Sequence, residues 1–287
     1  MDNKEVIALI NLLDDPDEDI FQHVKDELFL LGEQAIPVLQ DAWESSFGFS
    51  HKKRSVVLQS RIEDLIHAIQ FTFITKELTS WIEKEGSLLD GTQIIAKYQY
   101  PDLDQKKIKK QIELIKEDVQ FRLKKSYSPN ENIQIMNKVF FDLYNYRGNT
   151  QNFHAPQNSF INDVLETKTG TPLSLCILYI IIGRMVGLPL YGINLPKHFI
   201  ACYKTIDEDV EFYINPFSRG AIFNRRDITD FLKQLEVEPK MSFFQPCSNV
   251  DMIERCLVNL DYSYQKLGYL EKLEEIRELM KVIDKTK

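Results

Sequence analysis

The sequence predicts an α+β fold that is mostly helical, with one buried central helix packed on a small antiparallel sheet. Three observations lead to this prediction. Apolar residues recur at helical spacing through most of the first 147 residues, and runs of strand-forming residues occur only from Leu190 onward. Between these two parts, residues 172–186 are apolar on almost every side, which is typical of a helix surrounded by the protein core.

The first 86 residues are predicted to form helices joined by short acidic turns, and part of this region is similar to one HEAT-type repeat. The helices are expected at roughly 6–13, 17–31, 34–45 and 53–84. Asp14-Asp15-Pro16 ends the first helix, and Gly32 follows the second at the position where glycine commonly ends a helix. One such repeat cannot bury its own apolar face, and the sequence contains no clean second copy.

The middle of the chain, residues 87–245, is predicted to form the core domain. Helical spacing continues to residue 147, and a polar loop is expected over residues 148–158. A short helix follows at about 159–166, and Ser159 is the residue that we expect to cap its first turn.

The central helix has clear signals at both of its ends. Thr171 is a favoured N-cap residue, and Pro172 suits the first helical position because its ring already holds the helical φ angle. Gly187 is the residue type that most often follows the end of a helix. The helix should therefore occupy the stretch between Pro172 and Gly187.

Three strands, one more helix and a final pair of helices are expected after the central helix. The strands are expected at residues 190–194, 198–203 and 210–215. A polar turn covers 205–209, a helix should begin at Asp227, and residues 246–287 should form two helices broken at Gly268. This last pair is similar to a single tetratricopeptide-like hairpin, which would have to pack on the core.

The composition of the 287-residue chain is that of a globular protein, with 44% hydrophobic and 27% charged residues. Its 35 basic and 43 acidic side chains give a formal net charge of −8. A nucleic-acid-binding surface needs a basic footprint, so the charge balance predicts that nucleic acid is not a partner.

The chain is predicted to be a soluble, cytoplasmic protein that does not bind membranes. Its N-terminus lacks the basic start and the small-residue cleavage site of a signal peptide. The longest apolar run, residues 173–186, is too short to cross a bilayer and contains Arg184. The four cysteines form no Cys-x-x-Cys pair and the histidines show no metal-ligand spacing, so we expect free thiols, no metal and no cofactor.

His198 and Asn215 form the first pair that could take part in chemistry. His198 opens the second predicted strand and Asn215 closes the third. A turn centred between residues 206 and 207 would place them directly opposite each other, and a turn one residue later would place them on a diagonal. The side chains can meet in both registers, although a histidine beside an asparagine is also a common structural pair.

Thiol enzymes of the transglutaminase and papain-like type combine a cysteine at the start of a buried helix, a histidine on a neighbouring strand, and an Asp or Asn that orients the histidine. From about Asp90 to Asn224 the chain resembles the bacterial SirB-type transglutaminase-like family, and many short stretches in the same order carry the resemblance. These stretches are Tyr100-Pro101-Asp102-Leu103-Asp104, Asn137-Lys138-Val139-Phe140, Arg147-Gly148-Asn149, Pro156-Gln157-Asn158-Ser159, Gly170-Thr171-Pro172-Leu173-Ser174-Leu175, Gly187-Leu188-Pro189, Pro196-Lys197-His198-Phe199 and Ile214-Asn215-Pro216-Phe217. The resemblance implies a transglutaminase-like fold, often followed by tetratricopeptide helices, and it implies no established activity.

The resemblance also implies which residue takes the place of the nucleophile. In the wider active superfamily the central helix usually begins Gly-x-Cys and ends near Gly-Ile-Pro, and the spacing of 17 residues from Gly170 to Gly187 fits this frame without a gap. The nucleophile position then falls on Pro172, the histidine position on His198, and the orienting position, usually Asp, on Asn215. Proline has no nucleophilic atom, and asparagine orients an imidazole without stabilising its positive charge.

Cys176 is the thiol that would have to replace the missing nucleophile. It lies on the same face of the helix as Pro172 but about 6 Å farther along the axis, whereas a nucleophile must come within roughly 3 Å of its base. Its apolar neighbours predict a buried thiol with a raised pKa. Ser174 lies about 200° round the helix from Pro172 and is better suited to capping or to a surface position.

The polar loop before the central helix supplies further candidates for a ligand cleft. His154 is the candidate with a titratable ring, although asparagine-rich loops often satisfy their own backbone. The predicted cleft residues are Asn149, His154, Asn158, Pro172, Ser174, His198 and Asn215.

The sequence favours a non-catalytic protein with a regulatory or peptide- and protein-binding role. In this hypothesis the degenerate core holds a peptide or small ligand, and the helical ends contact a protein partner. The alternative is a thiol-dependent peptidase, amidase or acyltransferase that uses Cys176 with His198 and Asn215. A second alternative is a structural helical scaffold in which the core is vestigial.

Overall fold

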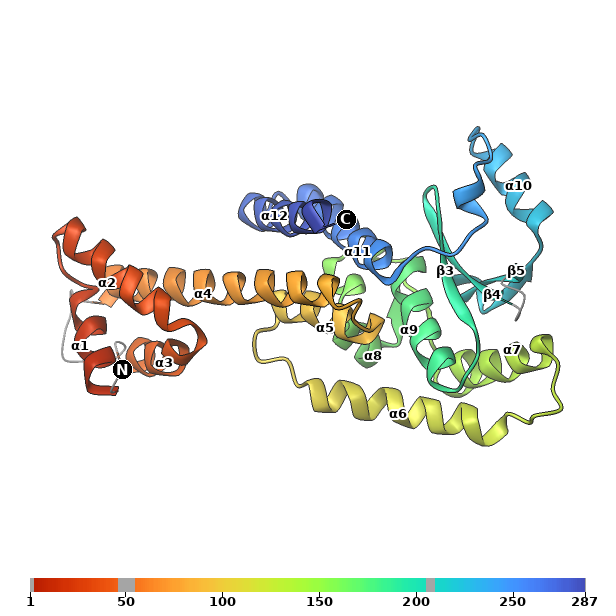
Figure 1. Cartoon of the computed structure of the whole chain (residues 1–287), viewed down its shortest axis with the longest axis horizontal. Helices are drawn as coiled ribbons and strands as arrows, with labels where there is room; N and C mark the ends of the chain where they lie inside the picture. The colour runs from red at the N-terminus through yellow and green to blue at the C-terminus, as the bar shows by residue number, and fades with distance from the viewer. Residues whose placement is uncertain (1–2, 46–54, 205–209, 287) are drawn as a thin grey trace. The chain divides into compact units, whose positions relative to one another are not determined.

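The computed structural model describes residues 3–45, 55–204 and 210–286 of the chain (Figure 1). It contains two compact units, Met1–Glu77 and Leu78–Lys287. The predicted α+β fold is confirmed, because the described chain is mostly helical and the second unit holds a small antiparallel sheet. None of the helices in the described ranges is both long and apolar enough to cross a membrane.

The N-terminal unit is a group of helices around one apolar core. Its helices are α1 (Asn3–Leu12), α2 (Glu18–Leu31), α3 (Ile36–Ser45) and the first part of α4 (Ser55–Glu83). Gly32 ends α2 with a φ of 59°, in agreement with the prediction. The predicted start of the fourth helix, residues 53 and 54, lies outside the described residues. The centre of this core is formed by Leu13, Leu28, Leu39 and Ile62.

The second unit contains eight further helices that the structure describes. They are α5 (Leu88–Gln99), α6 (Gln105–Arg122), α7 (Pro129–Asn137), α8 (Ile161–Thr167), α9 (Pro172–Met185), α10 (Arg225–Gln234), α11 (Asn249–Leu267) and α12 (Leu270–Thr286). A π-helical turn, Lys138–Leu143, follows α7 directly. Gly268 separates α11 from α12 with a left-handed φ of 74°, at the predicted break.

The sheet of the second unit has the strand order β3–β4–β5–β6, and each neighbouring pair is antiparallel. Its strands are β3 (Leu190–Leu195), β4 (His198–Lys204), β5 (Val210–Asn215) and β6 (Ala221–Phe223). The first three were predicted, and β6 was missed because three residues are too few to show a strand pattern. The predicted turn at 205–209 lies outside the described residues.

A second, parallel pair of strands joins the polar loop to the start of the central helix. It consists of β1 (Arg147–Gly148) and β2 (Thr169–Gly170). Two-residue strands have no sequence signature, so the prediction of an open loop at 148–158 did not include this pairing.

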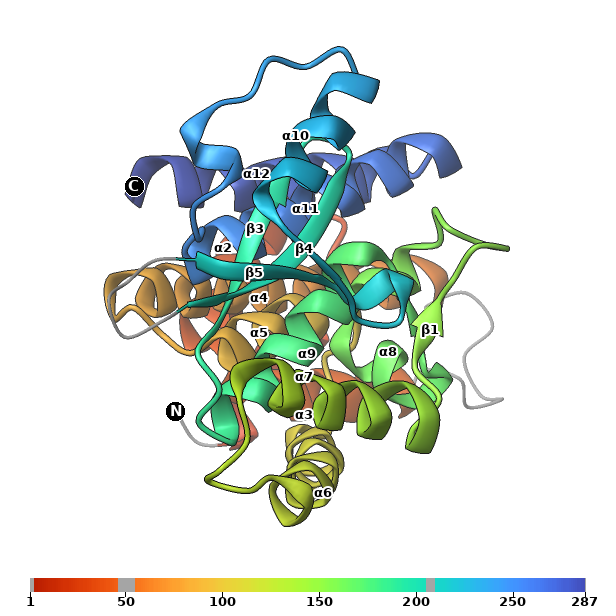
Figure 2. The same ribbon diagram turned by 90° about the vertical axis from the view of Figure 1, so that its right-hand side faces the viewer.

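The central helix α9 is buried along its first twelve residues, from Pro172 to Gly183. Figure 2 shows β3, β4 and β5 above it. Gly183 permits the close approach of the sheet, since a Cβ at this position would lie 2.3 Å from Leu190 Cδ1. The hydroxyl of Tyr179 donates to Asn137 Oδ1 at 2.7 Å, which satisfies this buried polar group.

Two predicted helix starts are wrong. Ser159 does not cap α8: the N-cap is Phe160, which makes no side-chain hydrogen bond, and Ser159 ends a 3₁₀ turn at Pro156–Ser159. Asp227 is not the first residue of α10. It is the third, and its carboxylate accepts the backbone N–H of the true N-cap, Asn224, at 2.8 Å.

Candidate functional site

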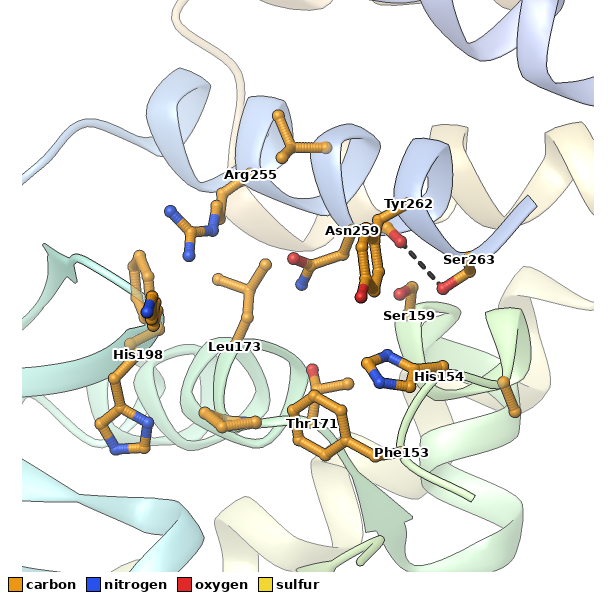
Figure 3. Close-up of a pocket in the computed structure, with 15 residues that line it drawn as sticks. Phe153, His154, Ser159, Thr171, Leu173, His198, Arg255, Asn259, Tyr262 and Ser263 are labelled. Carbon is orange, nitrogen blue, oxygen red and sulfur yellow. Dashed lines mark hydrogen bonds between the residues drawn. The ribbon is translucent and has the colours of Figure 1, made fainter. Parts of the chain in front are cut away.

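A cavity of about 480 Å³ lies in the second unit, beside the N-terminus of α9 (Figure 3). Its walls are the start of α9, the turn between β3 and β4 with the first residues of β4, the 3₁₀ turn with the loop before it, and one face of α11. This volume is in the range of pockets that hold small molecules. Of the predicted cleft residues, the cavity brings together His154, Pro172 and His198.

The start of α9 is held by a reciprocal capping box. Thr171 Oγ1 accepts the N–H of Ser174 at 3.2 Å, and Ser174 Oγ accepts the N–H of Thr171 at 2.9 Å. Gly170 leaves room for this arrangement, because a Cβ there would lie 2.6 Å from Ser174 Oγ. Ser174 is therefore a buried capping residue, and it is not among the residues that line the cavity.

Pro172 is the first residue of α9 and lines the cavity with Thr171 and Leu173. Its side chain is a hydrocarbon ring, and its backbone has no N–H group. The position that the resemblance assigns to a nucleophile therefore offers the cavity neither a nucleophilic atom nor a hydrogen-bond donor.

His198 and Asn215 are diagonal neighbours on adjacent strands. β4 and β5 pair Ala201 with Ile214 and Cys202 with Tyr213, so the register is the later of the two predicted. Asn215 Nδ2 lies 3.0 Å from His198 Nε2. Asn215 is buried and is not among the residues that line the cavity, whereas His198 lines it.

The hydrogen bonds of Asn215 define which of its atoms faces the imidazole. Its Oδ1 accepts the backbone N–H groups of Phe217 at 3.1 Å and Ser218 at 3.3 Å. Its Nδ2 is left to donate, to Ser218 Oγ at 3.2 Å and to His198 Nε2 at 3.0 Å. Because Nε2 accepts this bond, the proton of the neutral ring lies on Nδ1.

Burial also favours the neutral imidazole. Phe217 and Phe231 flank the ring of His198, with centroids 6.4 and 6.0 Å from its own. This partly dry environment lowers the pKa of His198 below its ordinary value.

Asn149 and Asn158 shape the loop and are not among the residues that line the cavity. Asn149 Nδ2 donates to Asn158 Oδ1 at 2.9 Å, and Asn158 Nδ2 donates to the carbonyl oxygen of Phe153 at 3.2 Å. These bonds hold the loop so that Phe153 and His154 reach the cavity. The ring of His154 contacts that of Tyr262 from α11, with centroids 5.1 Å apart.

Sequence reasoning missed the wall formed by α11. Figure 3 shows Arg255, Asn259 and Tyr262 extending from this helix toward the start of α9. The residues of this wall are Arg255, Val258, Asn259, Tyr262 and Ser263. They recur at intervals of three and four residues, so they share one face of the helix. The sequence signal that could have indicated this wall is the polar stripe on α11, which lies opposite the apolar face of the helix.

Cys176, the alternative nucleophile, is fully buried and is not among the residues that line the cavity. Burial raises the pKa of its thiol well above the ordinary value, and the neighbouring Cys247 and Cys202 raise it further. Since the thiolate is the reactive form of cysteine, this environment gives Cys176 the character of a core thiol.

The groups that the cavity offers to a ligand are cations, neutral polar groups and apolar surface. Lys197 and Arg255 line it, and none of its lining residues is Asp or Glu. Lys197 has a left-handed φ of 58° in the turn between β3 and β4 and directly precedes His198 in the chain. In the part of the chain that the structure describes, no group of three or more His, Cys, Asp or Glu side chains is placed to bind a metal.

A protein-family model described as the transglutaminase-like superfamily matches residues 106–258, a little over half of the chain. The matched region contains Pro172, His198 and Asn215, together with Arg255 of the α11 wall.

Relatives with curated sequences match shorter stretches. The UPF0162 protein of Xylella fastidiosa (strain Temecula1) is 27% identical over 147 residues, which cover 50% of each chain. The UPF0162 protein of Vibrio cholerae is 30% identical over 95 residues, or 33% of this chain and 34% of the relative. F-box only protein 21 of Homo sapiens is 32% identical over 94 residues, or 31% of this chain and 15% of that protein. The chain thus spans half or less of the length of these relatives, and no solved structure matches it at a comparable level of significance.

Proposed function

This chain belongs to the transglutaminase-like superfamily, and we propose that it is a non-catalytic member that binds a ligand in the cavity beside His198. The observation that carries the proposal is Pro172, which begins α9 and lines the cavity at the position assigned to the nucleophile. The imidazole and its partner Asn215 remain within hydrogen-bonding distance. A cavity with a base but no nucleophile can hold a ligand, but it cannot form a covalent intermediate on residue 172.

The thiol-dependent alternative has less support. Cys176 would need to reach the cavity and lose its proton, yet it is fully buried and its pKa is raised. Both observations favour binding over covalent chemistry.

We also propose that the chain is a SirB-type protein whose C-terminal helices form a tetratricopeptide-like hairpin that contacts a protein or peptide partner. The similarity to the UPF0162 proteins supports the first part. The pairing of α11 with α12 across Gly268 supports the second. Tyr269 and Leu270 are 55% and 69% exposed at this turn, and they give a partner apolar surface to contact.

Catalysis is tested directly with purified protein and a panel of peptide amides, esters and glutamine-containing peptides. We expect no turnover above the buffer rate, either for the wild-type protein or for His198→Ala. Hydrolysis or cross-linking by the wild-type protein that disappears in His198→Ala would show that the protein is an enzyme.

Ligand binding is tested by NMR screening of a library of small molecules and short peptides. Val258→Trp adds bulk at the cavity wall, where the native side chain is 39% exposed. Leu114→Trp adds the same side chain on α6, where the native residue is 50% exposed and lies outside the cavity lining, and it serves as the matched control. We expect compounds that bind the wild-type protein and Leu114→Trp but not Val258→Trp. The proposal fails if no compound binds, or if Val258→Trp binds every compound as tightly as the wild-type protein.

A further inference from the structure

We infer that the ligand of this cavity carries a carboxylate that binds Arg255, and an apolar body that packs between α9 and α11. The inference rests on the proposed ligand-binding function and adds the chemical class of the ligand.

The first observation is the charge of the cavity compared with that of the chain. The chain has 43 acidic and 35 basic side chains. The cavity reverses this balance, because its lining includes Lys197 and Arg255 but neither Asp nor Glu. His154 and His198 add two rings that carry either no charge or a positive one. A cleft lined by one sign of charge concentrates ligands of the opposite sign, so this cavity favours anions.

The second observation is that the guanidinium of Arg255 has no acidic partner among the described residues. Its described hydrogen bond joins Nη1 to Asn194 Oδ1 at 3.3 Å, and this amide oxygen is uncharged. Asp251, one turn earlier on α11, accepts the N–H and the hydroxyl of Ser248 at 2.8 and 2.7 Å in the capping box. Arg255 is half-buried, and its burial lowers the pKa of the guanidinium. A partly buried cation without a counter-ion is destabilising, and a bound anion would relieve this cost.

The third observation distinguishes a carboxylate from a phosphate. Phosphate sites at helix N-termini use several free backbone N–H groups. At the start of α9, Thr171 N and Ser174 N already donate within the capping box, and Pro172 has no N–H. Of the first three residues of the helix, only Leu173 keeps a backbone N–H outside the capping box, so the several free N–H groups of a phosphate site are not present there. A carboxylate needs only the two parallel donors of the Arg255 guanidinium, and Lys197 adds positive charge to the same cavity.

The remaining lining describes the rest of the ligand. Figure 3 shows Asn259 between Arg255 and Tyr262, and the described residues provide no hydrogen-bond partner for its side-chain amide. This amide can donate to the same carboxylate or to a neighbouring polar group. Leu173 and Val258 lie on facing walls and supply apolar surface. A carboxylate next to an aliphatic or aromatic body fits this arrangement.

Two sources share this chemistry: a free organic acid and the C-terminal end of a peptide. The experiment uses the full chain and isothermal titration calorimetry with 4-phenylbutyrate and its amide, and with apolar tripeptides that have a free or an amidated C-terminus. We expect each carboxylate to bind at least about tenfold more tightly than its amide. Tighter binding of the tripeptide acids would identify a chain terminus, and tighter binding of 4-phenylbutyrate a free acid. Inorganic phosphate that binds as tightly as the carboxylates would overturn the inference.

Substitutions connect the affinity to the assigned side chain. Arg255→Met keeps much of the apolar stem and removes the charge, and we expect it to weaken carboxylate binding by about 10- to 100-fold. It should leave the affinity for the amides unchanged. Arg226→Met removes an exposed arginine that is not part of the cavity lining and should change neither affinity. Arg255→Lys, which keeps the charge but not the fork, should bind carboxylates with intermediate affinity, and thermal melts establish that each variant is folded.

The outcomes separate this inference from the proposed function. If amides bind in the cavity as tightly as acids, or Arg255→Met binds acids like the wild-type protein, the inference is wrong and ligand binding stands. If neither acids, amides nor the wider library bind, the proposed function fails as well.

Discussion

Asn215 Nδ2 lies 3.0 Å from His198 Nε2, while Asn215 Oδ1 accepts two backbone N–H groups. The amide therefore holds the imidazole through a nitrogen that carries no proton. In thiol and serine hydrolases an Asp at the corresponding position stabilises the imidazolium that forms during catalysis. Asn215 provides orientation without that negative charge, so the pair is suited to a fixed, neutral ring.

His198 should titrate below the ordinary imidazole pKa, because burial lowers its pKa in the folded protein. The unfolded chain binds this proton near pH 6.5, so between that value and the folded pKa the unfolded state carries more protons. The contribution of His198 to the free energy of unfolding is therefore fully present above about pH 6.5, and it is lost as the pH falls through the folded pKa. Over this window the free energy of unfolding changes by at most about 1.4 kcal/mol per pH unit. NMR titration measures the folded pKa, and urea unfolding of wild type and His198→Gln at several pH values measures the slope. A folded pKa at or above the ordinary value would contradict this account.

Replacing Asn215 by aspartate should raise the pKa of His198. A carboxylate beside the ring favours the imidazolium, whereas the native amide contributes no net charge. Asn215→Asp retains an oxygen that can accept from Phe217 N and Ser218 N, so the short turn should persist. The same NMR titration measures the change. Ser218→Ala, which removes a hydroxyl hydrogen-bonded to Nδ2 without adding charge, is the control and should leave the pKa closer to the wild-type value.

The capping box at Thr171 should contribute measurably to stability. Thr171→Ala removes the hydroxyl that accepts the N–H of Ser174, and loss of an N-cap side chain typically costs about 1 kcal/mol. Thr171→Ser keeps the oxygen and should lose much less. Urea unfolding of the three proteins gives the comparison, and equal destabilisation by both substitutions would show that the methyl group, not the cap, is what matters.

The cysteines should differ in reactivity according to their burial. Burial raises the pKa of Cys202 and Cys256 to about 12, and raises that of Cys176 well above its ordinary value. Cys247 is only half-buried. In a timed reaction with iodoacetamide followed by mass spectrometry, Cys247 should be labelled first, and Cys176 should react far more slowly than in urea-unfolded protein. Rapid labelling of native Cys176 would restore the thiol-enzyme hypothesis.

Most of the fold could be predicted because its elements carry strong local signals. Thr171, Pro172 and Gly187 mark the two ends of α9, and the strands from Leu190 onward are rich in strand-forming residues. The predictions of secondary structure failed where an element is too short to show a pattern, or where two nearby residues carry the same helix-start signal. The pairing of β1 with β2 spans only two residues on each strand, and Asn224 and Asp227 are both good helix-start residues, of which tertiary structure selects one.

The candidate site was predictable where its residues are close in the sequence, or where the family resemblance assigns a position, as it does for Pro172 and His198. The pairing of His198 with Asn215 followed from one hairpin, whose possible registers are few. The wall formed by Arg255 and Asn259 depends on where α11 packs, and no local pattern specifies that. Asn149 and Asn158 show the reverse case: their residue type suggested a site, but their hydrogen bonds are used inside the loop.

Pro172→Cys tests the assignment of the nucleophile position. A thiol at this position would begin α9 and line the cavity beside His198, where the positive end of the helix favours the thiolate. We expect it to react with iodoacetamide at least about tenfold faster than the buried Cys176, with a pKa below the ordinary value of about 8.5. Adding His198→Ala should slow this reaction if the imidazole assists the thiol, whereas His67→Ala, which alters a histidine of the N-terminal unit, should not. If the new thiol reacts no faster than thiols of the unfolded chain, and His198→Ala has no effect, residue 172 does not occupy the nucleophile position of the superfamily.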